Sequence, residues 1–100
     1  MDPDKPDFMI ADVVKPIAGR EAGKLFYVVG TDDDYLYLAN GKDRSLEKPK
    51  RKKRKHATKV LRSETRVAEK LCAGDKVLNS ELRKDLTYFG REQECNATGG

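Results

Sequence analysis

The segment Leu25–Gly41 reads LFYVVGTDDDYLYLANG and predicts two β-strands separated by a polar turn. Its first part, Leu25–Gly30, is rich in the β-branched and aromatic residues that strands favour. In Tyr35–Ala39 aromatic and aliphatic residues alternate, so Leu36 and Leu38 share one face of the second strand. We therefore expect a sheet whose interior is supplied largely by Val28, Val29, Leu36 and Leu38.

Short turns connect this pair to further strands. Ala11–Ile17 is a third β candidate, and Leu46 and Glu47 are expected to begin a fourth. The Asn40-Gly41 dipeptide matches a type I′ hairpin turn, in which both central residues have positive φ. The connections are too short for crossover helices, so we expect antiparallel pairing in a small, strongly bent sheet.

Residues 48–62, called the basic strip below, carry the positive charge of the protein. They contain nine Lys or Arg and no acid, whereas residues 1–47 have a net charge of −4 and residues 63–100 one of −1. So dense a strip attracts polyanions, of which nucleic acid is the commonest in a cell. Pro49 disfavours a helix that starts before it, so we expect the strip to be extended and solvated in the free protein.

Helices are expected after the strip, behind an edge strand at Thr58–Leu61. The first spans Glu64–Ala73, with Ser63 as its N-cap. The second is capped by Asn79 or by the serine that follows it, and it ends at Gly90. Its apolar residues recur at i, i+4 and i+7, which is typical of a helix that docks on a sheet. This stripe consists of Leu82, Leu86 and Phe89.

The stretch Ala11–Asn40 has the layout of a KOW motif: a strand, a basic loop containing glycine, and a strand that ends in glycine. The residues that carry this layout are Val13-Val14-Lys15, AGREAGK at 18–24 and LFYVVG at 25–30. With DDYLYLANGK at 33–42 and LEKPKRKK at 46–53, the chain resembles small bacterial KOW-domain RNA-binding proteins, which are similar to KOW-containing large-subunit ribosomal proteins. The resemblance covers roughly residues 9–90. It implies an SH3-like barrel that binds ribosomal RNA through its loop and basic extension.

The expected fold is thus mainly β: a small SH3-like barrel of the KOW type, with a basic extension and one or two short C-terminal helices. The 100 residues leave room for one small domain. The expected division is a disordered N-terminus at 1–8, the barrel at 9–47, the RNA-binding extension with its edge strand at 48–62, helices packed on the barrel at 63–90 and a flexible tail at 91–100.

Candidate RNA-binding residues lie in the basic loop and in the strip. Gly19 and Gly23 let the backbone turn sharply and approach a partner closely. Arg20 can direct two donors at one phosphate, and Lys24 acts as a point charge. The alternative for this loop is a solvated hairpin tip with ordinary charges. The predicted contact residues are Lys15, Gly19, Arg20, Gly23, Lys24, Lys42, Arg44, Lys48, Lys50, Arg51, Lys52, Lys53, Arg54, Lys55, His56 and Lys59.

Other features have plainer interpretations. Tyr27, Tyr35 and Tyr37 are suited to stacking on unpaired bases, but we favour a place in the core or the outer wall of the barrel. The acidic run at 32–34 is interpreted as a solvated turn rather than a divalent-cation site. The strip lacks the interleaved Leu, Phe or Trp of a membrane-surface segment.

Several classes of protein are disfavoured. The sequence has no paired acid and base on an apolar pocket, no nucleophile elbow and no phosphate-binding loop, so we expect neither an enzyme nor a cofactor. It has one His, and its two Cys are too far apart for a Cys-x-x-Cys pair, so we expect no metal. No apolar run is long enough to cross a bilayer and no signal peptide is recognisable. We expect a cytoplasmic protein with reduced thiols, no membrane partner and a monomeric free state.

The function expected from these features is non-enzymatic binding of ribosomal RNA, with the RNA or the large ribosomal subunit as the partner. The mechanism is neutralisation of the RNA backbone by the loop and the strip. The rival hypothesis is a KOW-type protein-interaction adaptor of the transcription or translation machinery, in which the strip is only an anchor.

Overall fold

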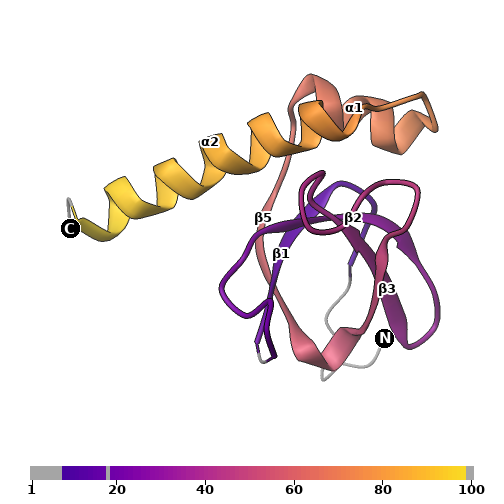
Figure 1. The fold of residues 1–100 in the computed structure, drawn as a ribbon, viewed down its shortest axis with the longest axis horizontal. Helices are drawn as coiled ribbons and strands as arrows, with labels where there is room; N and C mark the ends of the chain where they lie inside the picture. The colour runs from indigo at the N-terminus through magenta and orange to yellow at the C-terminus, as the bar shows by residue number, and fades with distance from the viewer. Residues whose placement is uncertain (1–7, 18, 99–100) are drawn as a thin grey trace.

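The computed structural model of the protein describes residues 8–17 and 19–98, and from residue 92 onward it describes the backbone only. The chain forms a five-stranded antiparallel sheet with two helices lying over one side of it (Figure 1). The prediction of a mainly β, antiparallel fold with C-terminal helices is confirmed. In chain order the elements are β1 (Asp12–Pro16), β2 (Phe26–Thr31), β3 (Tyr35–Ala39), β4 (Lys50–Lys53), the 3₁₀ turn η1 (Arg54–His56), β5 (Ala57–Arg62), α1 (Arg66–Ala73) and α2 (Asn79–Thr98).

The strands lie in the order β4-β3-β2-β1-β5, so the hydrogen-bonded sheet is open, with β4 and β5 as its edges. The predicted edge strand at Thr58–Leu61 is confirmed as part of β5, which pairs with β1. The register shifts between Val28 and Gly30 on β2 and between Val13 and Val14 on β1. Irregularities of this kind bend a strand and increase its twist, which curls the small sheet.

The inner side of the curled sheet holds one apolar core. Leu36 and Leu38 are fully buried there, as the alternation in β3 predicted. Phe8 belongs to the same cluster and is only 4% exposed, so the prediction of disorder is wrong for this residue, while residues 1–7 lie outside the described part of the chain. The cluster consists of Phe8, Val14, Phe26, Val28, Leu36, Leu38 and Ala57.

A second core lies between the sheet and the helices. It contains Val13, Tyr27, Ala39, Val67, Leu82, Leu86 and Phe89. The predicted stripe of α2 is therefore confirmed as the face that docks on the sheet. Val29, expected in the same interior as Val28, is only partly buried and packs on this second core instead. Neighbouring residues of a strand point to opposite faces, so Val28 and Val29 cannot share one core.

Tyr27 joins the sheet to the helices through its hydroxyl. The phenol donates to Asp85 Oδ2 on α2 at 2.7 Å, and the hydroxyl of Ser63 lies 2.8 Å from the phenol oxygen. The hydroxyl of Thr65 also donates to Asp85, and the ring packs edge-on against Phe89. Tyr27 is fully buried, so it belongs to the core, as we favoured, and is not available for base stacking.

The start of α1 and the end of α2 differ from the prediction, whereas α1 ends at Ala73 as predicted. Thr65 caps α1 by accepting from Ala68 N, because the hydroxyl of Ser63 is engaged with Tyr27. The predicted stop of the second helix at Gly90 is wrong, since α2 continues to Thr98 and residues 91–98 are helical rather than a flexible tail. A Cβ at Gly90 would stand at an ordinary contact distance of 4.0 Å from Leu25 Cδ1, so α2 passes beside the start of β2 at this position.

The basic strip is not a separate extension of a domain that ends at residue 47. Lys50–Lys53 pair with β3 as strand β4, and Ala57–Arg62 pair with β1 as strand β5. The boundary predicted at 47/48 therefore falls inside the sheet, and the strip is folded rather than freely solvated. Pairing with a neighbouring strand satisfies the backbone hydrogen bonds of these segments inside the protein, whereas an extended segment in water would bond to solvent instead.

The predicted type I′ turn and fourth strand are also wrong. Asn40 does not have positive φ, and Leu46 and Glu47 lie in the long β3–β4 loop between Ala39 and Lys50. The Asn40 side chain accepts backbone hydrogen bonds from Lys42 and Arg44, so it organises this loop from within. Local amide bonding of this kind competes with a hairpin.

Truncation of the inner core should be costly. Leu38 is fully buried, so Leu38→Ala should lower the free energy of unfolding by about 2–5 kcal/mol in urea denaturation. Leu78→Ala is the matched control, because Leu78 is 53% exposed and should cost less than about 0.5 kcal/mol. Equal losses in the two variants would contradict the position of Leu38.

The buried phenol makes stability depend on alkaline pH. Burial, helped by the charge of Asp85, raises the pKa of Tyr27 from 10.0 to about 12. The unfolded chain releases this proton near the lower value, so the contribution of Tyr27 is complete below that pH and is lost as the pH rises through the folded-state value. The loss should reach roughly 2–3 kcal/mol. The free energy of unfolding in urea, measured for the wild type and Tyr27→Phe between pH 10 and about pH 12, isolates the contribution of Tyr27. Parallel pH profiles of the two proteins would contradict this contribution.

Candidate nucleic-acid interface

A small concave site, called the basic groove below, lies where the basic strip meets two loops. Its volume is about 220 Å³. The β1–β2 loop, the β3–β4 loop and strand β4 all contribute to it, although they are well separated in the sequence. The groove holds four cationic side chains and one acid. Its lining residues are Gly19, Arg20, Glu21, Arg44, Lys50 and Lys52.

Pairing with β3 decides which lysines of β4 enter the groove. Lys50 lies opposite Leu38 and Lys52 opposite Leu36, so both lysines share the face of these leucines. Both lysines are partly buried, whereas the residues that alternate with them are exposed. Lysines that start on an apolar face and end at a rim keep their ammonium groups in water, so the groove is cationic at its surface.

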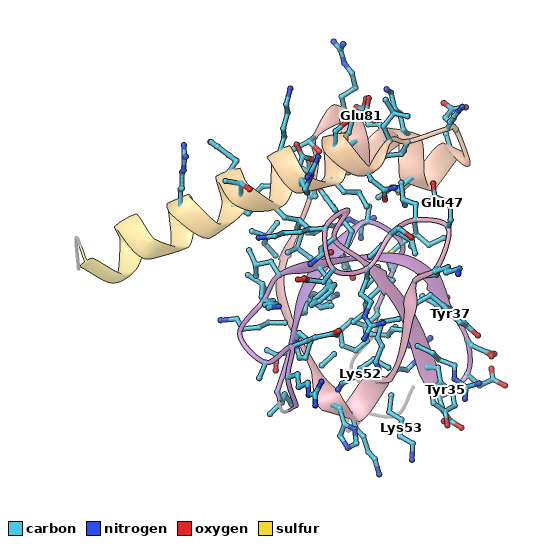
Figure 2. All side chains as sticks on the ribbon, in the orientation of Figure 1. Tyr35, Tyr37, Glu47, Lys52, Lys53 and Glu81 are labelled. Atoms are coloured by element: carbon cyan, nitrogen blue, oxygen red, sulfur yellow. The ribbon has the colours of Figure 1, made fainter. Side chains whose placement is uncertain are left out.

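The alternate residues of β4 lie on the opposite face. Arg51 and Lys53 are exposed there beside Tyr37 and Tyr35, and the Arg51 guanidinium stands 4.5 Å from the centre of the Tyr35 ring. In Figure 2 both tyrosines lie toward the lower right of the sheet, farther from the helices than Glu47. Tyr35 and Tyr37 are half-buried, which agrees with the wall position that we favoured for them.

The glycine-containing loop lies beside the strip. Gly19 and Gly23 both have positive φ, at 94° and 86°. A side chain at Gly19 would stand 3.7 Å from the Lys52 ammonium, so the side chain of Lys52 reaches from β4 to the loop. Arg20 follows on the exposed part of this loop. The structure thus brings together the two elements that the sequence singled out separately.

Two of the predicted cations already have acidic partners. Arg44 Nε lies 2.7 Å from Glu21 Oε1, and Lys24 Nζ lies 3.0 Å from Asp43 Oδ2. Hydrogen bonds from Lys24 and then from Asn40 hold the pKa of the Asp43 carboxyl below its usual range. These pairs join the β1–β2 loop to the β3–β4 loop. The Lys24–Asp43 pair is solvent-exposed and contributes little free energy, so a phosphate can compete with Asp43 for Lys24.

Two other predicted contact residues have structural roles that the sequence did not indicate. Arg54 donates from Nε and Nη2 to the carbonyl oxygen of Asp32, at 3.0 and 2.8 Å, and so ties η1 to the β2–β3 turn. Lys59 Nζ lies 3.1 Å from Asp12 Oδ2, and the Asp12 side chain is fully buried. A buried carboxylate requires a charged or hydrogen-bonding partner. The only sign of a buried carboxylate in the sequence was that Asp12 precedes two valines in a predicted strand.

The remaining predicted residues surround the sheet. Lys15 and Lys59 lie on the β1–β5 pair, at the other end of the strand order from β4. The exposed members outside the groove are Gly23, Lys24, Lys42, Lys48, Arg51, Lys53, Lys55, His56 and Lys59. The acidic turn at 32–34 is exposed as expected, and among the residues that the structure describes no group of His, Cys, Asp and Glu could hold a metal ion.

Sequence reasoning missed the contact that holds the β3–β4 loop on α2. Asn79, the first residue of α2, accepts from Leu46 N at 2.8 Å and donates to Glu47 Oε2 at 3.1 Å. At Gly41, which has φ 76°, a side chain would lie 2.0 Å from the Asn79 carbonyl oxygen. The loop and the helix therefore meet backbone to backbone, and this contact positions Arg44 in the groove.

Comparison of the sequence with known proteins found no match. No protein-family model matches the chain, and no curated protein matches it in sequence. Over residues 8–17 and 19–98 there is also no helix with the length and apolarity that a membrane span requires.

The backbone contact between loop and helix can be tested with two glycines. Gly41→Ala should lower the free energy of unfolding by about 2–5 kcal/mol, because positive φ and a backbone clash both oppose the new methyl group. Gly23→Ala is the matched control, since it also has positive φ but no atom within 4 Å, and it should cost only about 1–2 kcal/mol. Equal values in chemical denaturation would mean that the loop does not press on α2.

Proposed function

We propose that this protein is a non-enzymatic RNA-binding protein that acts at the ribosome and holds the backbone of ribosomal RNA in the basic groove. The observation that carries the proposal is the convergence of Arg20, Lys50 and Lys52 from distant segments on one concave site. Within the described residues, neither Arg20 nor Lys50 has an acidic partner, so their charge is available to a polyanion. The likeness of the loop and strip to KOW-domain proteins supports the same assignment.

We propose further that the sheet is an SH3-like barrel of the KOW type. Strands β1 to β4 are sequential antiparallel neighbours, and β5 returns to pair with β1. The edge strands β4 and β5 are joined only by the three residues of η1, and register shifts bend β1 and β2. A short joint between the two edges of a bent sheet supports this assignment.

The groove acts by neutralising phosphates. Lys50 and Lys52 are two residues apart on one strand face, about 6.7 Å along the strand, so each meets a different phosphate. Arg20 is suited to a two-pronged contact with one phosphate, which a lysine cannot make. Because duplex RNA hides its base edges in a deep, narrow major groove, such contacts recognise shape rather than sequence. Exposed acids on the β2–β3 turn oppose binding from that side.

The test compares two double variants of strand β4. Lys50→Gln/Lys52→Gln should flatten the dependence of log K on log[salt] by about 1.4–1.8 units, measured with protein-free ribosomal RNA. Arg51→Gln/Lys53→Gln removes the same charge from the other face of the same strand and should have a smaller effect. Equal salt slopes for the two variants would mean that binding depends only on net charge, which would overturn the groove as the binding site.

Co-sedimentation separates this function from the adaptor hypothesis. The wild-type protein should move with large ribosomal subunits at low salt and detach at high salt, and the groove variant should be lost from them already at low salt. Urea unfolding of both variants controls for folding. Retention of the protein on polymerase after RNase treatment, with no ribosome peak, would instead support an adaptor.

A further inference from the structure

Helix α2 carries a second cationic surface, opposite its docked stripe. At 100° per residue, positions 83, 84, 87, 88 and 91 fall within an arc of about 140°. This arc lies on the far side of the helix from Leu82, Leu86 and Phe89. All five positions are exposed, and with Ser80 they line a shallow depression of about 430 Å³. This α2 basic face consists of Arg83, Lys84, Thr87, Tyr88 and Arg91.

The acids of the same part of the helix are turned to other partners. Glu81 pairs with Lys70 of α1 at 3.2 Å, and Asp85 accepts from Tyr27. An ordinary solvated helix face mixes both signs of charge at spacings of three and four residues. The α2 basic face has three cations and no acid, and it ends where the sequence places Glu92 and Glu94.

A depression of about 360 Å³ lies between this face and the two loops that also line the basic groove. Arg83 and Thr87 line it together with Gly23 and Lys24 of the β1–β2 loop and Lys42 of the β3–β4 loop. The same two loops supply Arg20 and Arg44 to the groove. Cations therefore follow one another from β4, over the loops, to α2, and the two acids that line this path, Glu21 and Asp43, are paired with Arg44 and Lys24.

From this continuity we infer that the α2 basic face is a second contact for the RNA, which receives the phosphate backbone of a duplex that starts in the basic groove. The inference rests on the proposed function and extends it to a two-surface recognition of duplex RNA. Arg83 and Arg91 are about 12 Å apart along the helix axis, a spacing suited to a row of phosphates. Tyr88, 58% exposed, presents an aromatic ring to the same surface.

The two surfaces are held at a fixed relative position. The Tyr27–Asp85 hydrogen bond fixes the middle of α2 on the sheet, and the Gly41–Asn79 contact fixes its start on the β3–β4 loop. Figure 1 shows the C-terminal part of α2 extending beyond the sheet. The α2 basic face lies opposite the stripe that docks on the sheet, so it is reached without passing the β-strands. Rigid spacing of two cationic surfaces favours an RNA of matching shape and length.

The experiment uses two RNA hairpins, with stems of about 16 and about 6 base pairs. At about 2.8 Å per base pair in A-form RNA, the longer stem exceeds the 35 Å length of the molecule, whereas the shorter one covers only part of it. Arg83→Gln/Lys84→Gln should flatten the salt slope on the long hairpin by about 1.4–1.8 units and weaken binding about 25- to 60-fold at 0.1 M salt. On the short hairpin, which reaches only the groove, it should match the control.

The control is Arg66→Gln/Lys76→Gln, which also removes one exposed arginine and one exposed lysine but from α1 and the connection to α2. Its effect should stay below about twofold, since charges beyond a Debye length are screened. The charge-preserving variant Arg83→Lys/Lys84→Arg should bind the long hairpin like the wild type, which separates loss of charge from loss of folding.

The outcomes distinguish the two proposals. If the α2 variant equals its control on the long hairpin while Lys50→Gln/Lys52→Gln weakens binding to both hairpins, the second contact is wrong and the groove stands. If the α2 variant loses the same affinity on both hairpins, the length-dependent second contact is overturned. If the wild-type protein binds neither hairpin nor ribosomal RNA, the proposed function fails, and the second contact fails with it.

Discussion

The hydrogen bond from Tyr27 to Asp85 is the constraint on which the arrangement of this protein depends. A phenol that is fully buried must keep its partners, because an unsatisfied hydroxyl in an apolar core is costly. Its partners come from the chain before α1 and from α2, so satisfying one side chain of β2 positions both helices. With α2 in place, the β3–β4 loop can close on Asn79, and the loop in turn brings Arg44 to the groove.

The basic strip has several tasks rather than one. Lys50 and Lys52 line the groove, Arg51 stacks on Tyr35, and the guanidinium of Arg54 is committed to the β2–β3 turn. Lys59 neutralises a buried aspartate. Net charge therefore overstates the number of cations that a polyanion can meet, because folding has used some of them to stabilise the sheet.

Local pattern was enough to predict the strands of residues 11–39, the docking stripe of α2 and the glycine loop beside Arg20. Such patterns depend on residues near in sequence, whose periodicity reports the buried face directly. The Tyr27 network, the cap at Thr65, the turn at Asn40 and the exposed face of α2 escaped prediction. The Tyr27 network and the cap at Thr65 depend on partners distant in sequence, so tertiary contacts overrode local propensity there. The turn at Asn40 instead results from hydrogen bonds of its side-chain amide to nearby backbone, which the dipeptide pattern did not distinguish from a hairpin.

The sequence by itself determined that a small antiparallel sheet would form and that one segment would concentrate the positive charge, since both are properties of neighbouring residues. Only the tertiary structure decided which of those charges form a site. The register that sets Lys50 opposite Leu38 directs Lys50 and Lys52 to the groove and Arg51 and Lys53 away from it. Because side chains alternate along a strand, a slip of one residue would exchange the two pairs without changing the composition of the strip.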